Sequence, residues 1–218
     1  MSAFLPHVLL NNHFLVTSGR SIFWENEKAL ILSDLHLGKT GHFRKSGIAI
    51  PQTVLVEDMQ RLIAQIQFYK AEKLIIVGDL FHSNENKELD FFLKWRKDLP
   101  HIHLHLVKGN HDILKDSWYR EANIIVHKHS LTIGDFSFVH DINDCNEDEH
   151  HYCFSGHIHP GIKIRGAGRQ ALQLACFYFG KKYAVLPAFG KFTGTFPLQP
   201  EKGDVVFGLV DKSVVRIQ

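Results

Sequence analysis

The stretch Ala29-Leu30-Ile31-Leu32-Ser33-Asp34-Leu35-His36 combines a short apolar run with two polar side chains directly after it. A continuous apolar run of this length is typical of a strand that is buried on both faces, as in a parallel sheet. The run Lys73–Val77 repeats the pattern and ends at Gly78-Asp79. Between the two runs, residues 52–70 carry apolar side chains at helical spacing, and Pro51 suits a first helical position. This order of strand, helix and strand predicts an α/β fold.

The rest of the chain continues this alternation and then becomes rich in strands. Residues 86–98 predict a second helix, and residues 114–121 predict a short third one. Histidines alternate with apolar residues over 101–106, which predicts a strand with one polar face; a metal-binding row of histidines is the alternative. Further strands are predicted at 7–10, 14–17, 21–24, 124–126, 131–133, 136–140, 162–164, 171–179, 183–186, 205–210 and 214–217. Since no repeat, linker or low-complexity segment interrupts the pattern, we predict one domain over residues 1–218.

The composition is that of an ordinary soluble protein. Of 218 residues, 44% are hydrophobic and 22% are charged, and no apolar run approaches the about 20 residues of a membrane span. The N-terminal residues have no basic region before their apolar stretch, so we expect no signal peptide. Cys145, Cys153 and Cys176 are an odd and sparse set, which predicts unpaired cysteines and a cytoplasmic location. We expect Cys153 to be a buried thiol.

The charge is unevenly distributed. There is no Asp or Glu from His150 to Pro200, although six Lys and Arg residues lie there, and the preceding stretch 141–149 is acidic. Such segregation either marks a face that attracts polyanions or reflects solvated lysines beside an exposed loop. The aromatic and basic segment 177–183 has two interpretations as well, a stacking platform for single-stranded nucleic acid or, as we favour, rings packed in the core.

Five short polar motifs are spread along the chain, and four of them follow a strand-like run. They are Asp34-Leu35-His36, Gly78-Asp79-Leu80-Phe81-His82, Gly109-Asn110-His111-Asp112, Val139-His140 and Gly156-His157-Ile158-His159. Because the ends of adjacent parallel strands meet at one edge of an open sheet, we expect the motifs to come together. Read singly, each donor has an ordinary alternative as a helix cap, a turn residue or a surface histidine. Together they predict a two-metal site, which would activate water and neutralise a phosphate.

In this order, the motifs resemble the calcineurin-like metallophosphoesterase superfamily over residues 34–159. The resemblance implies a sandwich of two mixed β-sheets flanked by helices, and a metal-dependent phosphoesterase activity. It implies two groups of metal ligands that share Asp79: Asp34, His36, Asp79 and His159 for the first ion, and Asp79, Asn110, His140 and His157 for the second. This mixed donor set suits manganese, iron or zinc better than magnesium or calcium, and we expect two divalent ions, with manganese first.

The same resemblance implies roles for residues beside the metal ligands. A hydroxide between the two ions would attack phosphorus in line, and His111 would assist the leaving oxygen, with Asp112 orienting its ring. Lys39 and Arg44 either contact a phosphate or belong to a surface loop. The family often has Gly where this chain has Asp141, which leaves the adjoining acidic loop unexplained.

Further segments point to one branch of the superfamily. Gly78-Asp79-Leu80-Phe81-His82 is similar to the nuclease branch, in which the histidine at the position of His82 faces the substrate phosphate. Gly38-Lys39 with Phe43-Arg44, Gly47–Pro51 and Leu186–Gly194 are similar to the ligase-associated DNA damage response endonucleases, which are compact bacterial enzymes. The resemblance thus implies a DNA endonuclease in bacterial repair, with DNA ligase, helicase and exonuclease as partners and no membrane.

Two other functions are compatible with the superfamily. One is hydrolysis of a small or lipid-linked pyrophosphate or phosphodiester, which for lipid substrates should come with an exposed amphipathic helix that we do not find. The other is a non-catalytic scaffold on the same fold. The second is disfavoured because this chain keeps His111 and every metal ligand.

Overall fold

The structure is a computed structural model, and it describes residues 2–38, 53–82, 87–145, 150–166, 171–191 and 193–218. The two predicted phosphate contacts, Lys39 and Arg44, lie outside the described residues. So do the segment 47–51 and the first residues of both long predicted helices, 52 and 86.

The first sheet has seven strands in the order of the sequence. They are β1 (Phe4–Leu9), β2 (Asn12–Thr17), β3 (Ile22–Trp24), β4 (Ala29–Leu32), β5 (Lys73–Val77), β6 (His103–Val107) and β7 (Ile124–His127). Strands β1 to β4 form an antiparallel meander, whereas β4 to β7 run parallel. Parallel strands need long crossovers, and the described ones contain α2 (Thr53–Tyr69), α3 (Lys87–Asp98) and α4 (Asp116–Glu121). The predicted strand–helix alternation is confirmed.

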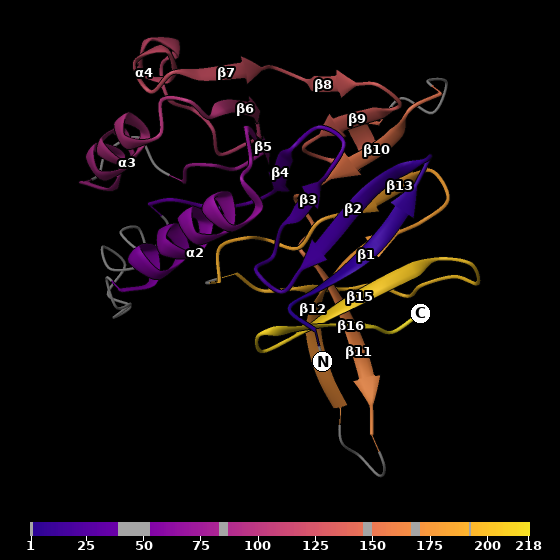
Figure 1. The fold of residues 1–218 in the computed structure, drawn as a ribbon. Coiled ribbons are helices and arrows are strands. Elements are labelled where there is room, and N and C mark those ends of the chain that lie inside the picture. Colours follow the sequence, from indigo (N-terminus) through magenta and orange to yellow (C-terminus); the bar gives the residue numbers. More distant parts are fainter. Residues whose placement is uncertain (1, 39–52, 83–86, 146–149, 167–170, 192) are drawn as a thin grey trace.

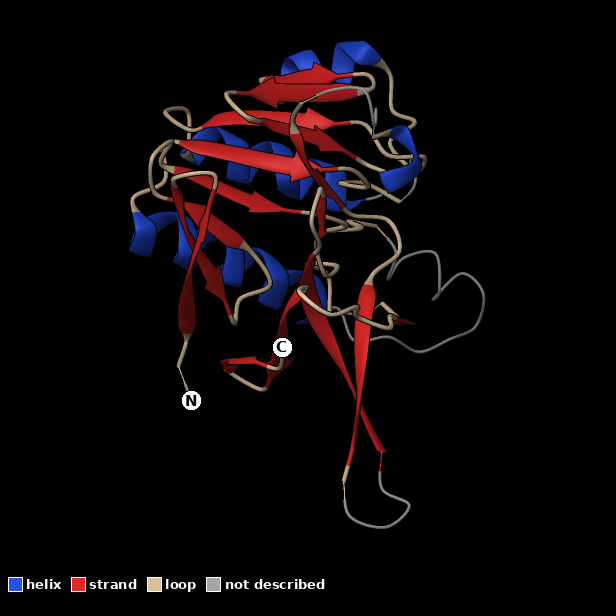
Figure 2. Cartoon of the chain, turned by 90° about the vertical axis from the view of Figure 1, so that its right-hand side faces the viewer, coloured by secondary structure: helices blue, strands red, loops and turns tan. Residues whose placement is uncertain are grey.

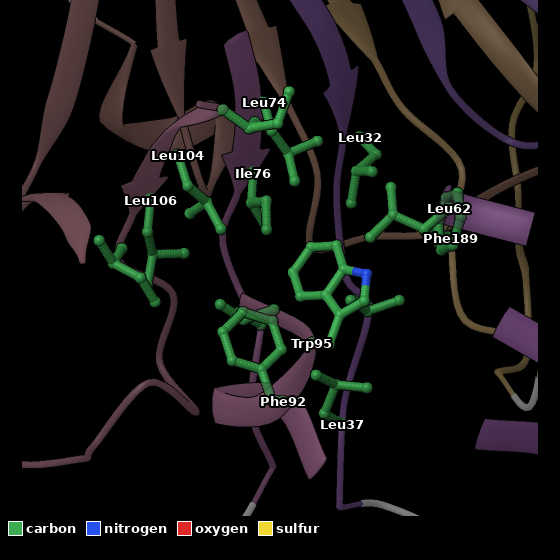
Figure 3. Packing of buried hydrophobic residues seen from close by; sticks show 14 of the residues in the cluster. Leu32, Leu37, Leu62, Leu74, Ile76, Phe92, Trp95, Leu104, Leu106 and Phe189 are labelled. Atoms are coloured by element: carbon green, nitrogen blue, oxygen red, sulfur yellow. The ribbon is translucent and has the colours of Figure 1, made fainter. Parts of the chain in front are cut away.

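Helices α2, α3 and α4 cover one face of the first sheet (Figure 1). Alternate residues of β4, β5 and β6 point to this face, and they pack against apolar side chains of α2 and α3 in one core. Figure 3 shows Leu74, Ile76 and Leu104 of the strands facing Phe92 and Trp95 of α3. Phe92 is fully buried. Burial of this kind stabilises the protein by about 25 cal/mol per Å² of apolar surface, so it fixes the strands whose ends carry polar motifs.

The second sheet lies against the other face of the first. It contains β8 (Ser130–Ile133), β9 (Phe136–Val139), β10 (Tyr152–Ser155), β11 (Pro160–Arg165), β12 (Ala171–Phe179), β13 (Tyr183–Val185), β14 (Phe196–Pro197), β15 (Val205–Val210) and β16 (Ser213–Arg216). Its main path is β14-β11-β12-β13-β10-β9-β8, with β15 and β16 paired beyond β12. β10 runs parallel to both β9 and β13, so the predicted pair of mixed sheets is confirmed. The sequence did not predict β10 and β14, which are only four and two residues long.

A second core joins the two sheets. It combines Phe14 and Ile75 of the first sheet with Phe138, Phe154 and Phe177 of the second. All five side chains are buried. The rings of Phe14 and Phe154 lie 5.7 Å apart between centroids, so aromatic packing holds one sheet on the other.

The β11–β12 hairpin extends beyond this sandwich as a long two-stranded arm (Figure 2). Its strands pair in an antiparallel register from Gly161↔Ala175 to Arg165↔Ala171. The short strand β14 pairs with the base of the arm, beside Pro160 and Gly161.

The prediction of unpaired cysteines is wrong for two of the three. Cys145 and Cys153 form a disulfide, in which the buried Cys153 at β10 is joined to the loop after β9. The two cysteines are eight residues apart in the sequence. The sequence did not predict the bond, because a disulfide framework is recognised from several pairs of cysteines and this chain has only one pair. Cys176 is a free, buried cysteine. No helix in the described part of the chain is long and apolar enough to cross a membrane.

Candidate metal centre

The polar motifs meet where both sheets end. Asp34, Asp79 and Asn110 follow the carboxyl ends of the adjacent parallel strands β4, β5 and β6. His140 and His157 follow β9 and β10 of the second sheet, which are also parallel neighbours. The prediction that strand ends collect the motifs is therefore confirmed, but the site is shared between two sheets. The fifth motif also follows a strand, β10, which the sequence did not reveal.

Most of the predicted metal ligands have a left-handed backbone conformation. The φ angles are 52° at Asp34, 51° at His36, 49° at Asp79, 67° at His157 and 50° at His159. Residues other than glycine rarely adopt this conformation, and each instance costs about 1–3 kcal/mol, which the surrounding structure must offset. Such strain is typical of functional sites. Here the left-handed residues turn the backbone sharply after the strands.

Two glycines allow the motifs to approach each other. A Cβ atom at Gly78 would lie 1.8 Å from Nδ1 of His140, and one at Gly109 would lie 2.2 Å from Oδ1 of Asp79. Gly78 also has a φ of 79°. Only glycine at these two positions leaves room for this approach, and the groups that approach are predicted metal ligands.

The first group of donors consists of Asp34, His36 and His159. Oδ1 of Asp34 lies 3.4 Å from Nε2 of His159 and 4.0 Å from Nε2 of His36. The two Nε2 atoms are 3.4 Å apart. One carboxylate oxygen and two imidazole nitrogens therefore converge on one small region.

The second group consists of Asp79, His140 and His157. Nε2 of His140 lies 3.6 Å from Oδ2 of Asp79 and 3.1 Å from Nδ1 of His157. Oδ1 of Asn110 is also 3.1 Å from Nε2 of His140, which adds an amide oxygen to the group. These are the four residues predicted to surround the second ion.

Asp79 lies between the two groups. Its Oδ2 faces His140 of the second group and is also 4.0 Å from Nδ1 of His36 of the first. Its Oδ1 accepts the backbone N–H of His111 at 3.0 Å. Asp34 divides its oxygens in the same way, because Oδ2 accepts the backbone N–H of His157 while Oδ1 faces the imidazoles. Each carboxylate thus has one oxygen that holds a loop and one that faces the donor cluster.

These residues fit a pair of divalent cations. Oδ1 of Asp34 is buried and has no hydrogen-bond partner in the described part of the chain. Burial raises the pKa of Asp79, in spite of the attraction of His140 and the N–H of His111. A buried carboxylate without a compensating charge is costly, and a bound cation would supply that charge. Oxygen and imidazole donors together are suited to transition metals such as manganese, iron or zinc.

The imidazoles have partners on the side away from the donor cluster. Nδ1 of His140 lies 3.5 Å from the carbonyl oxygen of Val77, and Nε2 of His157 lies 3.9 Å from Oδ2 of Asp141. A carbonyl or carboxylate in this position fixes the orientation of a metal-binding ring. Asp141, which stands where the family often has Gly, therefore lies beside a predicted metal ligand, His157.

The two predicted catalytic histidines lie beside the donors. The ring centroid of His111 is 4.4 Å from that of His82 and 5.8 Å from that of His36. Asp112, by contrast, does not have the role that the sequence predicted. Its two carboxylate oxygens accept the backbone N–H groups of Phe81 and Gly109 at 3.0 and 2.9 Å, so it joins two loops instead of orienting the ring of His111. Burial raises the pKa of Asp112 to about 7, against the effect of these two hydrogen bonds.

A segment after β13 supports the first group of donors through backbone hydrogen bonds that the sequence did not reveal. The Leu186–Gly190 part of the predicted family segment returns to the end of β4, where Phe189 and Gly190 donate backbone hydrogen bonds to the carbonyl oxygens of Ser33 and Asp34. Arg20 donates to the carbonyl oxygen of Ala188 at 3.1 Å. Arg61 of α2 lies over the ring of Phe189 at 4.3 Å. The only sign of this contact in the sequence was the spacing of Asp58 and Arg61, which lie three residues apart on α2. In the structure these two residues form an ion pair.

The aromatic segment 177–183 is divided between two environments. Phe177 and Phe179 are buried in the core between the sheets, as favoured from the sequence. Tyr178 and Tyr183 instead line a hollow of about 610 Å³ with Lys181 and Lys182. The histidines of 101–106 contribute to neither candidate metal group: His105 is paired with His127, with 3.0 Å between Nδ1 and Nε2.

Residues 27–124 match the family model of the calcineurin-like phosphoesterases, and the fold and the two donor groups agree with that match. No curated protein sequence matches the chain significantly.

Among solved structures, the Pseudomonas putida nuclease MPE has a TM-score of 0.83 and 25% sequence identity to this chain. The match covers 98% of this chain and 100% of that protein. The phosphoesterase Yfce from E. coli has a TM-score of 0.47 and 12% identity, covering 87% of this chain and 97% of Yfce, and is too distant to support an inference.

Proposed function

We propose that this phosphoesterase is a DNA endonuclease that cuts phosphodiester bonds with two divalent cations, manganese first among them. The observation that carries the proposal is the position of Asp79 between two groups of donors. The first cation would be held by Asp34, His36, Asp79 and His159, and the second by Asp79, Asn110, His140 and His157. When bound, such a pair lowers the pKa of water and neutralises charge on a phosphate.

The residues around the donors would position the substrate and move a proton. His111 lies at the edge of the cluster and would donate a proton to the leaving oxygen. His82, whose ring is 4.4 Å from that of His111, would contact a non-reacting phosphate oxygen. Asp112 would act through the backbone, because its hydrogen bonds fix the loops that carry Asp79 and His111.

DNA as the substrate is supported by the similarity to a nuclease over nearly the whole length of both chains. His82 and the segments around residues 38 and 186–194 support it as well. We further propose that residues 1–218 act as one catalytic domain, in the bacterial cytoplasm, in a repair pathway with a DNA ligase, a helicase and an exonuclease. Lys39 and Arg44 remain predicted phosphate contacts.

The proposal can be tested by a manganese-dependent nuclease assay on single-stranded and double-stranded DNA. The model diester bis-p-nitrophenyl phosphate is measured beside it. We expect the wild type to hydrolyse both kinds of substrate. We expect His111→Ala to lose most DNA cleavage, because general acid assistance contributes about 10²–10⁴-fold to the rate. His129→Ala is the matched control, since this histidine is exposed in the turn between β7 and β8.

Two outcomes would contradict the proposal. Hydrolysis of the model diester without any cleavage of DNA would make the chain a phosphodiesterase for small molecules. Full activity of His111→Ala on DNA would remove the proposed role of His111. A smaller loss with bis-p-nitrophenyl phosphate is compatible with that role, because p-nitrophenolate leaves without needing a proton.

A further inference from the structure

The β11–β12 arm begins directly at the candidate metal centre. β11 starts at Pro160, the residue after His159, and the backbone of His159 also accepts a hydrogen bond from the N–H of Phe196 at the base of the arm. From there the two strands project away from the sandwich (Figure 2). At about 3.3 Å per residue, the six residues of β11 extend roughly 17 Å from the centre.

One face of the arm continues the inner face of the second sheet. Successive residues of a strand point to opposite faces, so Gln173 points to the same face of β12 as Phe177 and Phe179. Those two rings are buried between the sheets. The register pairs Lys163 with Gln173 and Arg165 with Ala171, which places both cations on that face. Beyond the end of the core, the face that was apolar therefore becomes basic.

The opposite face has a different character. Near the base of the arm, Ile162 and Leu174 are buried against Cys176 and Val206 in a small core. Further out, Ile164 and Leu172 form a cross-strand pair with 39% and 57% exposed surface. The arm is thus an amphipathic ribbon whose apolar side is used to attach it.

The two cations on the basic face are available to a ligand. Lys163 and Arg165 are both exposed, and within the described residues neither forms an ion pair. The sequence contains no Asp or Glu from His150 to Pro200, so no carboxylate of that segment can neutralise them. Gln173 is held in place by Thr195, since its Nε2 donates to Oγ1 at 2.7 Å and to the carbonyl oxygen at 3.1 Å.

We infer that the basic face of the arm, with the cations of Lys163 and Arg165, binds the phosphate backbone of the nucleic-acid strand that leaves the metal centre. This inference rests on the proposed function. Charged residues on exposed strands also serve to prevent edge-to-edge aggregation. That purpose alone would not place both cations on the face that continues the inner face of the second sheet, while the other face exposes Ile164 and Leu172.

The test compares two double variants that remove the same charge. Lys163→Gln/Arg165→Gln removes the proposed contacts, and Lys94→Gln/Lys97→Gln removes two exposed lysines of α3. Binding of a fluorescent oligonucleotide is measured by anisotropy in EDTA, at several salt concentrations, with whichever of single strand or duplex the wild type binds more tightly. Hydrolysis of bis-p-nitrophenyl phosphate is measured with manganese, because this small diester does not reach the arm.

We expect the arm variant to bind the oligonucleotide about tenfold more weakly near physiological salt, and the salt dependence (log K against log salt) to become shallower by about 1.4 for a single strand. Its turnover of the small diester should equal that of the wild type. Affinity and salt dependence equal to those of the α3 variant would overturn the inference. A wild type that hydrolyses the small diester but neither binds nor cuts nucleic acid would contradict the proposed function itself.

Discussion

The candidate site has a first-sheet end, formed by the loops after β4, β5 and β6, and a second-sheet end, formed by the loops after β9 and β10. These two ends are built in different ways. At the first-sheet end, the loops after β4 and β5 hydrogen-bond to each other, from Asp34 N–H to the carbonyl oxygen of Gly78 at 3.1 Å and from His36 N–H to that of Asp79 at 2.9 Å. At the second-sheet end, the imidazoles depend on the opposite sheet. The backbone N–H of His157 donates to Oδ2 of Asp34, and Nδ1 of His140 faces the carbonyl oxygen of Val77.

The difference shows how a buried acidic cluster can be assembled. Adjacent parallel strands bring the two carboxylates together by their own backbone pairing. The imidazoles of His140 and His157 arrive only when the second sheet packs on the first, and Asp34 then holds the incoming loop through Oδ2. Damage to the contact between the ends should therefore affect metal binding more than damage within either end.

The largest effect is expected from Gly78→Ala. A methyl group there would overlap the ring of His140, and alanine would also be strained at a φ of 79°. Because this contact joins the two ends, we expect loss of the second donor group and a fall in activity of at least about 100-fold, as for small displacements of catalytic groups. Manganese binding by calorimetry and activity on bis-p-nitrophenyl phosphate would measure it.

Gly194→Ala is the control for this prediction, since a Cβ at that exposed glycine would meet nothing within 4 Å. If Gly78→Ala bound two manganese ions with the affinity of the wild type, the two ends would not depend on this contact.

An intermediate effect is expected within the second-sheet end, from Asp141→Asn. The carboxylate lies 3.9 Å from Nε2 of His157, and its Oδ1 also accepts the N–H of Asn143 at the start of the 3₁₀ turn η1 (Ile142–Asp144). Asparagine can keep that turn but loses the charge beside His157. We expect manganese affinity to fall about tenfold, the lower limit for the loss of such a supporting group, with thermal stability nearly unchanged.

Asp144→Asn, in the same turn but exposed, removes the same charge without touching His157. Equal manganese affinities of these two variants would show that Asp141 acts only through the general charge of the loop.

The smallest effect is expected for His105, which lies in the first sheet away from the site. This prediction concerns the stability of the fold and not metal binding. Burial, and secondarily His127 with Lys73 and His103, lower the pKa of His105 from 6.5 to about 4. The folded protein thus keeps His105 neutral, whereas the unfolded chain takes up a proton below about pH 6.5. The free energy of unfolding should fall between pH 6.5 and 4, and it should fall less in His105→Gln.

Urea unfolding in EDTA at pH 7 and pH 5 would measure this difference, with the exposed His101→Gln as control. The same pH dependence in all three proteins would exclude His105 as its source.

The strand ends that carry the donors could be read from local patterns. Buried parallel strands have continuous apolar runs, so Ala29–Leu32 and Lys73–Val77 were predictable, as was the polar residue that follows each. β10 was missed because its apolar run is only three residues long, from Tyr152 to Phe154. The Cys145–Cys153 disulfide and the role of Asp112 were missed for another reason: each depends on how a loop folds back, which residue type does not specify.

The sequence by itself determined which side chains are present at the ends of strands, and the order of its motifs indicated a phosphoesterase. Only the tertiary structure decided which atoms face each other. Residues 123 positions apart, Asp34 and His157, meet because two sheets pack through a shared aromatic core. That packing also brings His140 of the second sheet to Oδ2 of Asp79. A local pattern can place a donor at the end of a strand, but only packing between distant segments can aim it.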